Sequence, residues 1–325
     1  AVCPHCWAAN RHLRVARSLH CTGRRLVRRR RPPIDHRVTE AAVNGRVECM
    51  RYLVEHGAAF ERDTVVNAAI DGHSVECLAY VYEHGGVPEW PPETTSRCVY
   101  NAHFDCLRYA HEHGAPWDAH TTTQAAMRGH LRCLRYAHDN GAPWTLDTTL
   151  QAIIADRLAC LKYAHENGAP WHEESTLAAA SKGKTAMLEY VVNNGALWHP
   201  NTTLRAAGQG RFACLRWAHE HGAPWDPDTT WAAASGGHLA CLRYAHNNGA
   251  PWDARTTRAA VGGGRRLKRF TCLVYAHEHG APWDDNTTRV AARFGCLQTL
   301  QYVHEHGAPW DPATTDYARD AECIE

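Results

Sequence analysis

The sequence predicts an all-α solenoid of about ten stacked helix-turn-helix repeats. Two observations carry this prediction: tryptophan recurs at a fixed period, and each period contains two short segments with helical spacing. Trp90, Trp117, Trp144, Trp171, Trp198, Trp225 and Trp252 are 27 residues apart, Trp283 follows after 31, and Trp310 follows after 27. A fixed period of this size is typical of repeats that each pack against their neighbours.

Composition favours a soluble folded chain. Hydrophobic residues make up 44% and charged residues 21% of the 325 residues, as in ordinary globular proteins. The sequence has no apolar run near the roughly 18 residues that a membrane span needs, so we expect no membrane association and a monomer. The net charge is +1, but residues 1–31 contain nine Arg and no acid, which leaves 26 basic and 34 acidic residues in the other 294.

Residues 1–32 lie outside the repeat and are predicted to form a basic N-terminal arm, a possible remnant of another module. Its Cys and His residues have the donor types of a tetrahedral zinc site, with unordered reduced thiols as the alternative. These residues are Cys3, Cys6, His20 and Cys21. Its Arg run could contact phosphates or direct nuclear import, with a solvated linker as the alternative. The run comprises Arg24, Arg25, Arg28, Arg29, Arg30 and Arg31.

Residues 33–325 are predicted to form the repeat array, closed by a partial capping unit. The ten expected helix pairs span 33–57, 60–85, 90–114, 117–141, 144–168, 171–195, 198–222, 225–249, 252–280 and 283–307. Thr121 with Gln124, and Thr148 with Gln151, have capping-box spacing, which predicts the start of a first helix.

The end of each helix is predicted from glycine. Gly129 should end the first helix, after an alanine pair that permits close helix packing, and Gly141 should end the second helix in a left-handed conformation. Ala-Pro-Trp then makes a tight return to the next unit.

The segment AAMRGHLRCLRYAHDNGAPW resembles the ankyrin repeat in its alanine pair, Gly129, His130 and Gly141 followed by Ala142. The resemblance covers residues 33–325 and implies a helix pair with an outward β-hairpin in 33 residues. This chain lacks about six of those residues, so we expect shortened or absent hairpin fingers. Short repeats containing Trp look like those in ankyrin-type proteins of giant viruses that infect amoebae, which implies host interaction.

The recurring Trp, His and Cys side chains are predicted to be structural. Trp could form a stacking platform, but its strict period favours packing beside small Cys and Ala residues of the second helix. Most cysteines also repeat with the period, and equivalent residues on neighbouring helices about 8–10 Å apart are too distant for the roughly 7 Å of a disulfide. We therefore expect reduced core thiols, with Met187 and Thr299 in the same position.

Histidine recurs with the same period, as His111, His138, His165, His219, His246, His277 and His304. Successive members should be too far apart to share a metal ion, so we expect hydrogen-bonded partners and no cofactor. Because imidazole titrates near pH 6.5, acidification should loosen the array.

Function should lie where the repeats differ. Most first helices contain two consecutive threonines near their start, such as Thr148 and Thr149, and the positions after this threonine pair vary between repeats. These variable positions are predicted to bind a partner on the concave face: Gln124, Gln151, Arg205, Trp231, Arg258 and Arg289. Four extra residues in the 31-residue unit place Arg265, Arg266, Lys268 and Arg269 between two helices, as an anion-attracting patch or a tolerated loop insertion.

The predicted function is a non-enzymatic scaffold for a protein partner. The sequence contains no phosphate-binding loop and no nucleophile elbow. The alternative is an adaptor whose N-terminus binds zinc or nucleic acid. Reduced cysteines and the absence of a recognisable signal peptide predict a cytoplasmic or nuclear location rather than secretion.

Overall fold

A computed structural model describes residues 36–59, 61–84, 89–262, 266–294, 297–310 and 312–315. These residues form twenty α-helices in ten consecutive pairs, and none of them lies in a strand. The predicted all-α fold is confirmed. The turn between one pair and the next is short, as expected: only residues 221–228 separate α15 from α16.

The chain forms two compact units, one ending at Pro143 and one beginning at Trp144. The first helices of the pairs in the first unit are α2 (His36–Val43), α4 (Arg62–Asp71), α6 (Thr94–Tyr100) and α8 (Thr121–Arg128). The second helices are α3 (Val47–Glu55), α5 (Val75–His84), α7 (Phe104–Glu112) and α9 (Leu131–Asp139).

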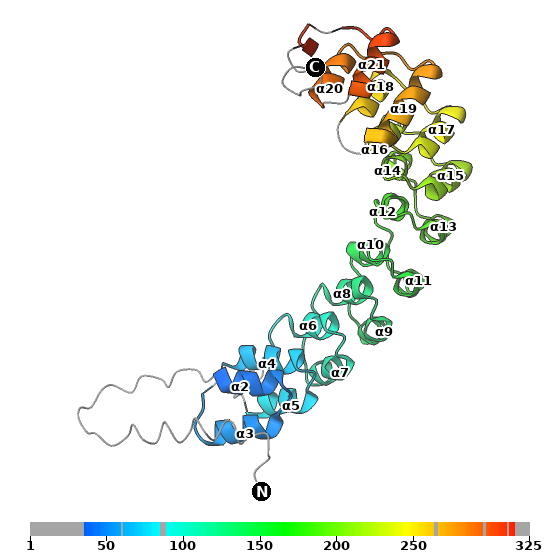
Figure 1. Ribbon diagram of the computed structural model, residues 1–325. Coiled ribbons are helices and arrows are strands. Elements are labelled where there is room, and N and C mark those ends of the chain that lie inside the picture. Colours follow the sequence, from blue (N-terminus) through cyan, green and yellow to red (C-terminus); the bar gives the residue numbers. More distant parts are fainter. Residues whose placement is uncertain are drawn as a thin grey trace, which may run out of the picture. The chain divides into compact units, whose positions relative to one another are not determined.

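The second unit contains six pairs. Its first helices are α10 (Leu146–Ile154), α12 (Ser175–Lys182), α14 (Thr202–Gly208), α16 (Thr229–Gly236), α18 (Ala254–Val261) and α20 (Thr287–Arg293). Its second helices are α11 (Leu158–Glu166), α13 (Thr185–Asn193), α15 (Phe212–Glu220), α17 (Leu239–Asn247), α19 (Arg266–Glu278) and α21 (Leu297–Glu305). Within each unit the first helices form one row and the second helices another (Figure 1).

Small residues let the first helices approach closely. Ala206, Ala207 and Ala233 are fully buried between neighbouring helices of this row. A Cβ atom added to Gly208 would lie 3.3 Å from the Cβ of Ala232, and one added to Gly236 would lie 2.7 Å from the carbonyl oxygen of Gly208. The contact between α14 and α16 therefore requires glycine at position 236.

The second helices supply the larger core side chains. Leu215 and Ala218 of α15 are completely buried, as is Cys214, which directly precedes Leu215 in the sequence. The cysteines among the described residues are free thiols, buried except for the half-buried Cys49, and Met187 occupies the same position in α13 with 2% exposure. The prediction of small, unpaired core thiols is confirmed for this part of the chain.

The predicted N-caps are wrong. His120 is the N-cap of α8, so Thr121 is already helical. In α10 the capping box joins Thr145 and Thr148, which places Thr148 inside the first turn. The reason is that the threonine pair is buried and its second member is used between repeats: the Thr149 hydroxyl donates to the Pro170 carbonyl at 2.8 Å.

The glycine helix ends are confirmed. Gly129 follows α8 with φ 82°, and Gly141 follows the end of α9 with φ 89°. No atom lies within 4 Å of a Cβ added to Gly141. Backbone conformation alone therefore selects glycine there, because other residues rarely adopt a positive φ.

The four extra residues of the 31-residue unit do not form the loop that we predicted. They lengthen α19, which has 13 residues where α17 has nine. The preceding helix α18 ends at Gly262 in an extended conformation, φ −62° and ψ 156°. Arg269 Nη1 donates to the Gly262 carbonyl at 2.5 Å, so the guanidinium satisfies the carbonyl of the residue that caps α18.

Candidate partner-binding groove

The recurring tryptophans join each repeat to the next. Trp225 Nε1 donates to the Asn248 carbonyl at 3.0 Å, at the end of the following second helix. Its ring stacks on His219 with centroids 4.5 Å apart and meets the Tyr244 ring edge-on at 6.3 Å. The same indole bond is made by Trp90, Trp117, Trp144, Trp171 and Trp283. The tryptophans thus pack between repeats, as predicted, but the ring partners seen are His and Tyr side chains.

Four of the recurring histidines are seen to bond to a tyrosine hydroxyl of the next repeat, in agreement with the prediction. His219 Nδ1 lies 3.0 Å from the Tyr244 hydroxyl of the next repeat. Equivalent bonds start from His111, His246 and His277. Burial lowers the pKa of His246, with a further contribution from His279. Among the described residues no three His, Cys, Asp or Glu side chains are grouped to hold a metal ion.

The threonine pairs form a third connection between repeats. The Thr203 hydroxyl donates to the Pro224 carbonyl at 3.0 Å and lies 3.2 Å from the Thr229 hydroxyl. Both threonines are essentially inaccessible to solvent. The recurring Trp, His and Thr side chains thus bind the neighbouring repeat, so a surface for a partner must come from other residues.

A groove between α14 and α16 provides such a surface in the second unit. Its volume is about 270 Å³. It is lined by Leu204, Arg205, Gly208, Gln209, Trp231, Ala232, Ser235 and Gly236. The structure therefore brings together two predicted partner-binding residues, Arg205 and Trp231, from neighbouring repeats.

The two residues are available to a ligand. Trp231 is 37% exposed. Moving a large apolar ring out of water is favourable, so this exposed ring can contribute to binding. Arg205 is exposed and has no ion pair with the described residues. The groove exists because Gly208, Ser235 and Gly236 are small where other repeats carry larger side chains, such as Ile154.

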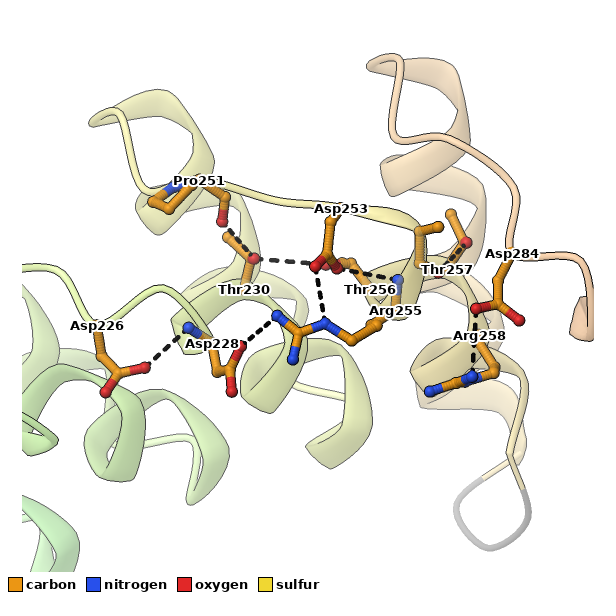
Figure 2. Close-up of polar contacts among 11 residues, drawn as sticks. Asp226, Asp228, Thr230, Pro251, Asp253, Arg255, Thr256, Thr257, Arg258 and Asp284 are labelled. Atoms are coloured by element: carbon orange, nitrogen blue, oxygen red, sulfur yellow. Dashed lines mark hydrogen bonds and ion pairs between the residues drawn. The ribbon is translucent and has the colours of Figure 1, made fainter.

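The other predicted residues of the second unit lie outside this groove. Arg258 of α18 is ion-paired with Asp284, Nη1 to Oδ2 at 3.2 Å, and the Asp284 side chain is only 13% exposed (Figure 2). Arg289 of α20 and Gln151 of α10 are half-buried. Arg258 is thus held by its partner, a relationship that the sequence did not indicate.

Sequence reasoning also missed a charge network beside α18. Arg255 Nη2 contacts Asp228 at 2.6 Å, and Arg255 Nε contacts Asp253 at 2.7 Å (Figure 2). This arginine links the turn before α16 to the turn before α18. Arg255 precedes the threonine pair of its helix, whereas all the predicted partner-binding residues follow theirs. Variation after the threonine pair therefore could not indicate Arg255.

Gln124 lies in the first unit, in a separate groove of about 550 Å³. That groove is lined by Asp71, Glu93, Ser96, Arg97, Tyr100, Asn101, Asp118, His120 and Gln124. Arg97 is paired with Asp71 through two hydrogen bonds. Arg97 has the same register as Gln124 and Arg205, so the repeat alignment could have identified it.

The predicted anion-binding residues fall into two groups. The N-terminal arginines, the candidate zinc residues and Arg265 lie outside the described residues. Arg266 begins α19, Lys268 is exposed, and Arg269 donates to Gly262. Arg266, Lys268 and Arg269 are therefore part of a helix instead of a loop patch.

No protein-family model and no curated protein matches this sequence. Among solved structures, the human ASB11 ankyrin repeat domain is similar over 51% of this chain and 85% of its own, with 21% identity and a TM-score of 0.43. The pentatricopeptide repeat protein PPR10 in complex with an 18-nt psaJ RNA element is similar over 98% and 55%, with 15% identity and a TM-score of 0.46. PPR10 from maize is similar over 99% and 54%, with 14% identity and a TM-score of 0.40.

None of the helices in the described ranges combines the length and the apolar character that crossing a bilayer would require.

Proposed function

We propose that this chain is a non-enzymatic scaffold of short ankyrin-type repeats that binds a protein partner through its first helices. The groove that contains Arg205 and Trp231 is the proposed centre of that surface. The observation that carries the proposal is the exposure of Trp231 beside this groove. Aromatic residues and Arg next to a pocket are frequent anchors of protein interfaces.

The rest of the repeat supports a scaffold role. The recurring His, Thr and Trp side chains are engaged between repeats, and the core cysteines are buried and unpaired. Stable reduced thiols fit a cytoplasmic or nuclear location. The order of an alanine pair, a left-handed glycine and a second helix supports the ankyrin-type assignment.

The test is proximity labelling by the intact chain in cells, with Trp231→Ala as the variant. Leu197→Ala is the matched control, because Leu197 is an 86% exposed apolar residue of the same unit and only its carbonyl is used by a neighbour. We expect Trp231→Ala to lose at least one labelled protein that Leu197→Ala retains. Identical labelling by both variants and the parent would overturn the proposal.

A further inference from the structure

Five of the six first helices of the second unit have a one-sided charge, whereas the remaining one, α10, contains Asp147. The bodies of α12, α14, α16, α18 and α20 contain no acidic residue. Their basic residues are Lys182, Arg205, Arg255, Arg258, Arg289 and Arg293. This row of helices is thus positive, although acidic residues outnumber basic ones in the array as a whole.

Acidic residues lie in the turns before these helices, and some of their carboxylates are engaged there. Asp226 accepts the backbone N–H of Asp228 at 2.8 Å, and Asp253 accepts that of Arg255 at 2.9 Å. Arg255 is neutralised further by its contact with Asp228. These carboxylates stabilise the turns, and those of Asp228 and Asp253 offset the charge of Arg255.

Three cations of the row remain without an ion pair among the described residues: Lys182, Arg205 and Arg293. Arg205 alone of these lines the groove, and Trp231 lines it from the neighbouring helix. The groove therefore offers one apolar contact and one uncompensated positive charge within the same small space. An occupant that complements both must carry an apolar group and an anionic group close together.

We infer that this groove binds an acidic peptide segment in an extended conformation, with an apolar side chain against Trp231 and a carboxylate at Arg205. The inference rests on the proposed function and specifies the chemistry of the partner. The groove volume of about 270 Å³ is below the roughly 300–1,000 Å³ of pockets for drug-sized ligands. It suits one or two side chains of a longer chain that continues over neighbouring helices.

Leu177 and Leu204 extend the apolar contact along the row. They occupy the register position of Trp231 in the two preceding repeats, and both are half-buried. Packed helices are about 8–10 Å apart, and three residues of an extended polyproline-type chain cover about 9 Å. A peptide with an apolar side chain at every third residue can therefore place one on each of these helices.

The same positions favour a peptide over nucleic acid. Successive bases need successive aromatic surfaces for stacking, but leucine precedes Trp231 in two repeats and Arg258 follows it in the next. The side chain of Arg258 is moreover paired with Asp284. A nucleic acid that continued along the row would bring its phosphates to the Asp284 carboxylate, and the two negative charges would repel each other. A peptide whose acidic segment ends at Arg205 would not reach Asp284.

The test is selection of peptides from a random displayed library on the intact chain, followed by calorimetric titration of the selected peptides. We expect enriched peptides to combine Asp or Glu with apolar residues about three positions apart. Trp231→Ala and Arg205→Glu should each weaken binding about tenfold or more. Arg205→Glu should also select basic residues in place of acidic ones. Arg216→Glu is the charge-matched control, because Arg216 lies on the second helix α15 and should not affect binding.

Each result separates the two proposals. The inferred acidic partner is overturned if the selected peptides contain no acidic residues, or if Arg205→Glu leaves their affinity unchanged. In that case weaker binding to Trp231→Ala would still support the proposed binding surface. Indifference to both variants would overturn both. A single-stranded RNA oligonucleotide is tested in parallel, and tighter RNA binding that depends on Trp231 and Arg205 would also overturn the inference. Equal thermal melting of all variants is required, and Arg205→Gln provides a second exposed variant if Trp231→Ala melts lower.

Discussion

The hydroxyl of Thr230 donates a hydrogen bond to the carbonyl of Pro251 in the following turn, 2.7 Å away. Thr203 makes the equivalent bond to Pro224, and Thr257 makes it to Pro282. Each bond ties a first helix to the turn that begins the next repeat. A buried threonine side chain thus adds a hydrogen bond between neighbouring repeats to those made by the recurring Trp and His residues.

Thr230→Val should therefore destabilise the protein by about 1 kcal/mol, because the substitution keeps the shape but removes the donor of a part-buried hydrogen bond. Urea denaturation followed by circular dichroism measures the loss. Thr271→Val is the matched control, since the exposed Thr271 hydroxyl bonds only to Lys268 in its own helix. An equal effect of both substitutions would show that the bond between repeats is not the cause.

Trp225→Phe should lower stability more than Trp198→Phe. Both substitutions shorten the side chain of a recurring tryptophan. Of these two residues, only Trp225 has an N–H that is hydrogen-bonded within the described residues, to the Asn248 carbonyl. The difference should be about 1 kcal/mol, the net contribution of one hydrogen bond. The measurement is the pair of denaturation midpoints, and the prediction fails if the two variants unfold at the same urea concentration.

Acidification should destabilise the second unit. Burial lowers the pKa of His246 and of His277 in the folded protein, and the neighbouring His279 and His306 lower these values further. A lowered folded pKa means that the unfolded chain binds protons more readily, so the stability present above about pH 6.5 is lost as pH falls. Thermal melts at pH 7.5 and pH 5 measure the effect, which His246→Gln should reduce. Identical melts at the two pH values would contradict it.

The core thiols should resist modification until the protein unfolds. Burial raises the pKa of Cys241 and of Cys272 to about 12, so almost no thiolate exists near pH 8. Among the cysteines of the described ranges, iodoacetamide labelling followed by peptide mapping should mark the half-buried Cys49 first. Labelling of Cys241 in the native protein at the rate of Cys49 would show that the core is more open than its burial implies.

The helix pairs could be predicted because tryptophan, glycine and alanine recur with a period that matches one structural unit. The start of each helix could not, because Thr148 looks like a cap in sequence but forms its capping box with Thr145. A hydroxyl can bond its own helix or the next repeat, and the choice depends on a turn about 21 residues later. Sequence spacing within one helix does not contain that information.

The sequence predicted two residues that line the candidate groove but not the groove itself. Trp231 and Arg205 were recognisable because they depart from the repeat, whereas the cavity itself depends on what Gly208 and Gly236 lack. Arg258 departs from the repeat as clearly as Arg205 does, yet Asp284 of the next turn pairs with it. Whether a variable cation is free depends on a neighbour 26 residues away, so departure from the repeat identifies candidates but does not rank them.

The extended α19 shows how much length one repeat can absorb. Its four additional residues are close to the 3.6 of one helical turn, and they enter at the start of the helix. The bonds to adjacent repeats keep their geometry: Thr257 to Pro282 is 2.8 Å, and His246 to Tyr275 is 3.1 Å. The start of a second helix is consequently a place where whole turns can be added or removed while the spacing of the repeats is preserved, which makes it a natural insertion point for an affinity tag or a sensor domain.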